Sequence, residues 1–163
     1  MWIKLLHTDQ MLKPINIFFI FCIVASRFLP HPPNFTPVIA IFMLSSGLTL
    51  LPLLITYMIT DAVIGFHTHM IWVYASLFAV AYFQRGAVFS SVLFFVITNF
   101  AFWTSGYYGY SIQGLIMCYI MAIPFFVNTL TSTVLFTIMF NYAKKNTLHH
   151  NIIGSHSRSL STS

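Results

Sequence analysis

The feature that most constrains this chain is a series of long apolar runs that charged residues rarely interrupt. Two of these runs, residues 15–26 and 88–97, carry no charged side chain and show no alternation of polar and apolar positions. Strands of a membrane barrel would alternate over about ten residues. Only 6% of the residues are charged, against about a quarter in soluble domains, so little polar surface can face water. The sequence therefore predicts an all-α integral membrane protein.

Prolines, glycines and polar turns divide the chain into six expected helices. These cover residues 15–29, 37–50, 52–65, 70–84, 87–103 and 112–142. The last stretch exceeds the ~20 residues of an ordinary span and contains Pro124, so it is either one kinked helix or a half-helix followed by a full one. We expect a compact bundle of about six transmembrane helices, the last kinked or broken near Pro124, forming one domain over residues 1–143. Residues 144–163 are polar and are expected to form a disordered cytoplasmic tail.

The distribution of basic residues predicts the orientation in the membrane. With six spans, one side holds Lys4, Lys13, Arg85, Lys144, Lys145 and Arg158, and the other side holds only Arg27. The positive-inside rule then places both termini in the cytoplasm. Residues 1–13 precede an apolar run without a small-residue cleavage site, so we expect a retained first span rather than a signal peptide.

Most of the unusual polar residues fall at the external ends of the expected helices. The predicted ligand-binding residues are Arg27, His31, Asn34, Asp61, His67, Asn99, Trp103, Gln113 and Asn128. An ionisable residue at the depth of Asp61 either pairs with Arg27 or contacts a ligand. Asn99 and Trp103, four residues apart, share one helix face. Either Asn99 forms a hydrogen bond to a neighbouring helix and Trp103 lies at the membrane interface, or both residues recognise a planar, polar small molecule.

A metal site is a further possibility at the same end. His67, His69 and Asp61 combine imidazole and carboxylate, which suit nickel, cobalt or zinc. The alternative is that the loop histidines cap helices or form hydrogen bonds, because their spacing is not diagnostic of a metal site. The sequence identifies no cofactor.

The residues also carry a resemblance to a known family. The segment RFLPHPPNFTP, residues 27–37, resembles the signature of a family of uncharacterised bacterial membrane proteins. Further matching features are Asp61 with Gly65-Phe66-His67, Thr98-Asn99-Phe100 with Trp103, Gly114-Leu115, Cys118-Tyr119 and 122–126. In size, helix number and site placement the chain is remotely similar to the S components of energy-coupling-factor vitamin transporters. That similarity implies an external small-molecule site and a separate ATPase module as energising partner.

Three functions remain open at this point. The first is a small-molecule or metal-ion capture subunit of an importer, in the inner membrane of a bacterium. Since the chain has no GxxxxGK[ST] motif, a partner would hydrolyse the ATP. The second is a structural or assembly protein without a ligand, and the third is an intramembrane metal-dependent enzyme. We expect no enzyme, because neither HExxH nor GxSxG occurs, and no nucleic-acid partner. Convergence of Asp61, His67, Asn99 and Trp103 on one open cavity would favour capture.

Overall fold

The computed structural model describes residues 14–161, with side chains described for residues 15–145. Within these residues the protein contains six α-helices and one short 3-10 turn, and no strand, which confirms the all-α prediction. The elements are α1 (Pro14–Phe28), α2 (Val38–Leu44), η3 (Gly47–Thr49), α3 (Leu50–Ile64), α4 (Met70–Phe83), α5 (Ala87–Trp103) and α6 (Ile112–Ser161).

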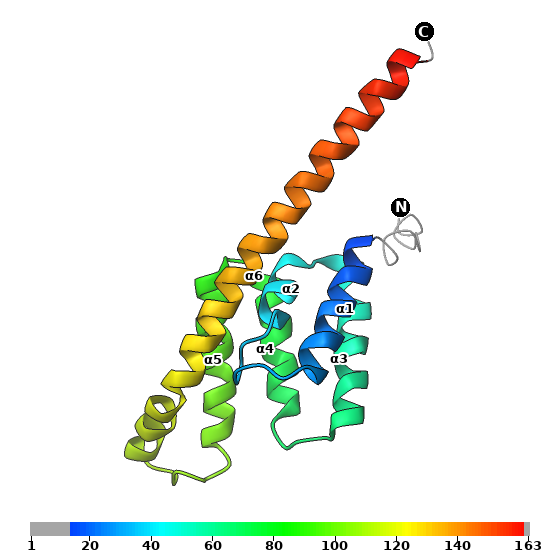
Figure 1. Cartoon of the computed structure of the whole chain (residues 1–163). Coiled ribbons are helices and arrows are strands. Elements are labelled where there is room, and N and C mark those ends of the chain that lie inside the picture. Colours follow the sequence, from blue (N-terminus) through cyan, green and yellow to red (C-terminus); the bar gives the residue numbers. More distant parts are fainter. Residues whose placement is uncertain (1–13, 162–163) are drawn as a thin grey trace, which may run out of the picture.

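The helices run alternately up and down the bundle. α1 begins and α6 ends at the same end, which also holds the connections from α2 to α3 and from α4 to α5 (Figure 1). The connections after α1, α3 and α5 lie toward the opposite end. α5 packs against both α4 and α6, and α1 packs against α3. α2 contacts α1, α4, α5 and α6. The short second helix therefore lies inside the bundle, among helices from both halves of the chain.

The second helix is shorter than the sequence predicts. Its residues from Val38 to Met43 are all buried, none more than 6% exposed. The expectation of one helix over residues 37–50 is wrong, because the chain becomes extended at Ser45. The Gln84 side chain donates a hydrogen bond of 2.6 Å to the carbonyl oxygen of the buried Ser45, which satisfies this acceptor where α2 ends. Seven residues rise only about 10 Å, so α2 is a buried half-helix and too short to cross a bilayer of about 30 Å.

The last helix is longer than predicted. α6 runs without interruption through Pro124, so the alternative of two separate segments is wrong. Residues 125–145 contain no glycine or further proline, and nothing there ends the helix. α6 continues to Ser161; the expected disordered tail, residues 144–163, extends beyond the described residues and stays a prediction.

Two segments of the described chain are long and apolar enough to cross a membrane. They are Gly47–Ile64 and Ile112–Lys145, while the apolar helices Ile15–Phe28, Met70–Phe83 and Ala87–Trp103 are shorter. Large apolar side chains point outward from these helices, for example Val63, Ile71 and Phe78, which are 68%, 77% and 59% exposed. The inside of the bundle, in contrast, holds an ion pair.

Candidate ligand-binding site

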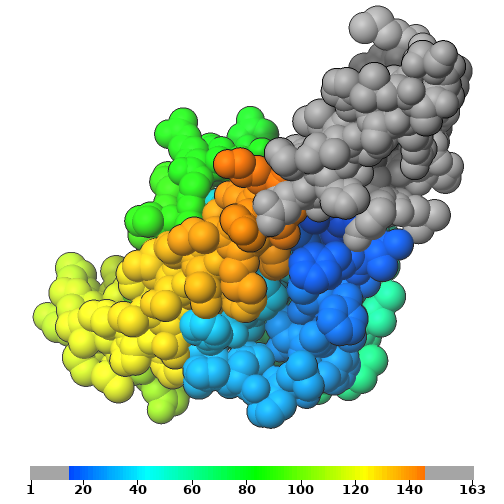
Figure 2. Space-filling view, turned by 45° about the horizontal axis from the view of Figure 1, so that its top comes forward, coloured from blue at the N-terminus to red at the C-terminus, as the bar shows by residue number. Residues whose placement is uncertain are grey.

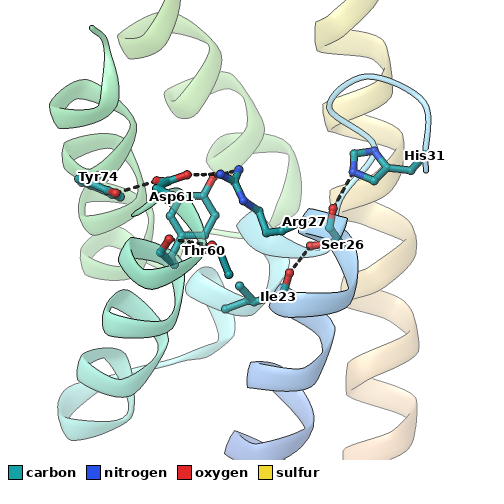
Figure 3. Close-up of polar contacts among 8 residues, drawn as sticks. Ile23, Ser26, Arg27, His31, Thr60, Asp61 and Tyr74 are labelled. Carbon is teal, nitrogen blue, oxygen red and sulfur yellow. Dashed lines mark hydrogen bonds and ion pairs between the residues drawn. The ribbon is translucent and has the colours of Figure 1, made fainter. Parts of the chain in front are cut away.

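The ion pair joins Arg27, near the end of α1, to Asp61 in the last turn of α3. Asp61 is 1% exposed, and its Oδ1 pairs with Nη2 of Arg27. The Tyr74 hydroxyl of α4 donates to Asp61 Oδ2 at 2.7 Å, so Arg27 and Tyr74 approach the carboxylate from opposite sides (Figure 3). Both carboxylate oxygens are thus engaged by the protein. The structure places Asp61 in an ion pair, one of the two roles that the sequence leaves open.

Arg27 also contacts Tyr57 of α3. Its Nη1 donates to the Tyr57 hydroxyl at 3.3 Å, and its guanidinium carbon lies 4.8 Å from the centroid of the Tyr57 ring. This distance is within the range of a cation–π interaction. Because these contacts join α1, α3 and α4, the pair fixes the relative positions of three helices.

The proline-rich connection, residues 29–37, is held in place from both sides. The ring nitrogens of His31 lie 2.7 Å from the carbonyl oxygen of Ser26 and 2.8 Å from that of Pro32, which ties the connection to the end of α1. From α6, Asn128 Nδ2 donates to the Pro33 carbonyl at 3.0 Å. Figure 2 shows this light-blue segment between blue α1 and the yellow and orange part of α6. Asn128 therefore binds the connection.

Beneath this connection lies a polar cavity of about 300 Å³. It is bordered by the connection, α1, α2, α3, α5 and α6, and eight of its twelve lining residues have polar side chains. The lining residues are Ser26, Arg27, His31, Asn34, Thr36, Val38, Ile39, Tyr57, Ile64, Phe94, Thr129 and Ser132.

An aromatic cavity of about 320 Å³ adjoins it between α5 and α6. Its lining residues are Asn34, Phe94, Phe95, Thr98, Asn99, Phe102, Tyr108, Cys118, Met121, Ala122, Phe125, Phe126 and Thr129. Asn34, Phe94 and Thr129 line both cavities, so the two meet where the connection, α5 and α6 come together. We call the pair the two-part cavity. Each half reaches the lower end of the size range of ligand pockets, about 300–1,000 Å³.

The structure gathers only some of the predicted ligand-binding residues. Arg27, His31 and Asn34 line the polar cavity, and Asn99 lines the aromatic one. Trp103 instead donates from its ring nitrogen to the Gly109 carbonyl at 3.1 Å. Gln113 is exposed on the first turn of α6. The predicted convergence on one cavity therefore does not include Asp61, His67 or Trp103.

The predicted metal set is not assembled. Among the described residues, no three His, Cys, Asp or Glu side chains are grouped so that they could hold a metal ion. His67 and His69 are exposed in the connection after α3, and the His69 ring packs 5.7 Å from that of Phe102. Asp61 points into the bundle, where Arg27 and Tyr74 occupy its oxygens. This prediction is wrong because carboxylate and imidazoles face different surroundings.

Sequence reasoning missed several lining residues. Thr129 and Ser132 are buried on α6, three residues apart and hence on one face; this polar stripe in an apolar helix is a signal that could have identified them. The phenylalanines of the aromatic cavity carry no such signal, since lipid-facing, core and cavity-lining phenylalanines look alike in the sequence.

These features define an all-α bundle with a two-part cavity next to a buried ion pair. The chain belongs to a family of unknown function (DUF6580), whose model matches residues 9–150. No curated protein and no solved structure matches the chain. The similarity to S components of energy-coupling-factor transporters stays a prediction.

Proposed function

We propose that this protein is a membrane-embedded bundle that captures a small molecule in its two-part cavity, as the binding subunit of an importer. The apolar outer surface supports the membrane assignment. Soluble proteins rarely expose apolar patches larger than a few hundred Å², yet exposed large apolar side chains occur along all five longer helices. Short helices such as the 14-residue α4 would require local thinning of the bilayer or tilt of neighbouring helices.

The charge distribution supports the orientation. The connection from α4 to α5, which carries Arg85, and the part of α6 that carries Lys144 and Lys145 lie at the end where α1 begins (Figure 1). The positive-inside rule makes this end cytoplasmic. The connection that covers the two-part cavity then lies toward the external side. We place the protein in a bacterial inner membrane, with both termini in the cytoplasm.

One observation carries the proposal of capture: two adjoining cavities meet at residues that the proline-rich connection, α5 and α6 each contribute. Ligand sites of this kind combine apolar walls with a few convergent polar groups. Neither cavity is lined by an aspartate or glutamate, and the one lining histidine, His31, has both ring nitrogens against backbone carbonyl oxygens. This lining favours binding over acid–base catalysis, which needs a titratable group within reach of the substrate. A separate ATPase module would supply energy for release into the cell.

Retention of a small molecule through purification tests this proposal. Leucine at Ala122, which lines the aromatic cavity, would fill part of it, whereas leucine at Ala75, exposed on α4, adds the same bulk outside. Organic extracts of the purified proteins are compared by mass spectrometry. We expect one compound that the wild type and Ala75→Leu retain and Ala122→Leu loses. Equal retention by all three proteins, or none by any, contradicts capture.

The Arg27–Asp61 pair favours a second candidate, a structural or assembly protein without a ligand. Asp61 and Asn128 have partners on other segments of the protein, as expected for polar residues that hold membrane helices together, and Asn99 bonds a carbonyl of its own helix. This candidate predicts that filling the aromatic cavity leaves function in the cell intact. Growth or uptake defects of the Ala122→Leu variant, without loss of protein, would exclude it.

A further inference from the structure

We infer that the two-part cavity takes an uncharged, planar molecule that carries a hydrogen-bonding edge, rather than an anion, an organic cation or a metal ion. This inference rests on the proposed capture function and specifies its substrate class. It follows from the charge, the free hydrogen-bonding groups and the aromatic walls of the cavity, taken in turn.

Apart from His31, whose two ring nitrogens face backbone carbonyl oxygens, the charge of the cavity is balanced without a ligand. Arg27 is the only Lys, Arg, Asp or Glu that lines either half, and its pairing with Asp61 neutralises it. An anion would therefore have to compete with a buried carboxylate for Nη2, and Nε, which has no hydrogen-bond partner among the described residues, is itself buried. An organic cation could contact the aromatic faces but would find no carboxylate in the lining. Because burying an unpaired charge is costly, an uncharged occupant is favoured.

The polar half offers both acceptors and donors. The hydroxyls of Ser26 and Thr129 donate to carbonyls of their own helices, each at 2.9 Å, so their oxygen lone pairs remain as acceptors. The Tyr57 hydroxyl accepts from Arg27, which leaves its own proton to donate. A matching ligand therefore carries both a donor and an acceptor, as a cyclic amide does.

The aromatic half favours a flat ring system. The rings of Phe95 and Phe126 lie 4.6 Å apart between centroids, and Phe94, Phe102 and Phe125 complete walls on α5 and α6. Such walls bind a planar ring through stacked or edge-on contacts at 4.5–7 Å. The side-chain amide nitrogen of Asn99 donates to the Phe95 carbonyl at 2.8 Å, so the side-chain amide oxygen Oδ1 can accept from a ring substituent. Thr129, which lines both halves, lies where ring and polar edge would join.

Four probes of one ring size separate these requirements. They are 2-quinolinone (uncharged, with a donor–acceptor edge), quinoline-2-carboxylate (anion), N-methylquinolinium (cation) and naphthalene (no polar edge). Affinities are measured by saturation-transfer NMR titration of the full chain in detergent, with protein-free micelles as blank. The variants are Ala122→Leu, Thr129→Val, which replaces the hydroxyl with a methyl group of similar size, and Ala75→Leu as the control.

We expect 2-quinolinone to bind the wild type at least about tenfold more tightly than the other three probes, a difference typical of one matched polar contact. Ala122→Leu should abolish this preference, Thr129→Val should weaken 2-quinolinone binding severalfold without affecting naphthalene, and Ala75→Leu should change neither. Stronger binding of either ion, or equal binding of naphthalene, overturns the inference while leaving capture intact. If no probe binds saturably, the compound retained through purification decides: an uncharged planar compound supports the inference, a charged one overturns it, and the absence of any retained compound refutes capture itself.

Discussion

Breaking the Arg27–Asp61 pair should destabilise the bundle more than removing both of its members. Asp61 is 1% exposed, and the Arg27 side chain is 21% exposed, so each single substitution leaves a largely buried charge without its partner. Loss of one member of a buried pair costs about 3–5 kcal/mol. We take about 3 kcal/mol for Asp61→Leu and for Arg27→Leu, since Arg27 retains some exposure. Apolar replacement of both members is often close to neutral, and we expect about 1 kcal/mol for the double variant.

The measurement is a double-mutant cycle. Unfolding of the four proteins by sodium dodecyl sulfate in mixed micelles is followed by circular dichroism, and the free energies of unfolding are compared. Arg85→Leu serves as a control, because Arg85 is exposed at the other end of the bundle, and it should shift stability by no more than about 0.5 kcal/mol. The double variant should be more stable than either single variant. If its loss equals the sum of the two single losses, Arg27 and Asp61 are not coupled and the reasoning fails.

Three further predictions concern orientation, the proline-rich connection and the start of α6. On a cysteine-free background, a membrane-impermeant maleimide should label Ser105→Cys in intact cells but Arg85→Cys only after permeabilisation; the reverse pattern would invert the topology. Asn128→Leu removes the hydrogen bond to the Pro33 carbonyl and should cost about 1 kcal/mol in detergent unfolding; an unchanged midpoint would show that this bond does not hold the connection. Gly114→Ala should lower the free energy of unfolding by about 1–3 kcal/mol, because a Cβ there would meet backbone carbonyl oxygens of the preceding loop. An unchanged free energy of unfolding would contradict this close packing.

Apolar periodicity and turn residues predict most helices of this protein closely. The predicted fifth helix, residues 87–103, coincides with α5, because Gly86 and a run of polar residues after Trp103 end it on both sides. The break inside residues 37–50 was missed. Serine and glycine at 45–47 are tolerated within membrane helices, and the tertiary contact from Gln84 that favours the break is not visible in the local sequence.

The candidate site is predictable only in part. Arg27 and Asp61 stand out because ionisable residues are costly in an apolar chain, and matching depth suggests their pairing. Asn128 stands out in the same way, yet it binds the connection rather than lining either cavity. The cavity walls depend on which face of α5 turns toward α6. In α5 the few polar residues, Ser90, Ser91, Thr98 and Asn99, stand among phenylalanines on every side, and a helix with so wide an apolar surface gives little indication of that orientation.

Native mass spectrometry of the intact protein, released from micelles, tests the central claim most directly. Capture in the two-part cavity predicts a single added mass on the wild type and on Ala75→Leu, matching a compound below about 500 Da, as expected for a pocket of this size, and no added mass on Ala122→Leu. Bare protein in all three samples, or the same added mass on Ala122→Leu, would contradict a small-molecule site between α5, α6 and the proline-rich connection.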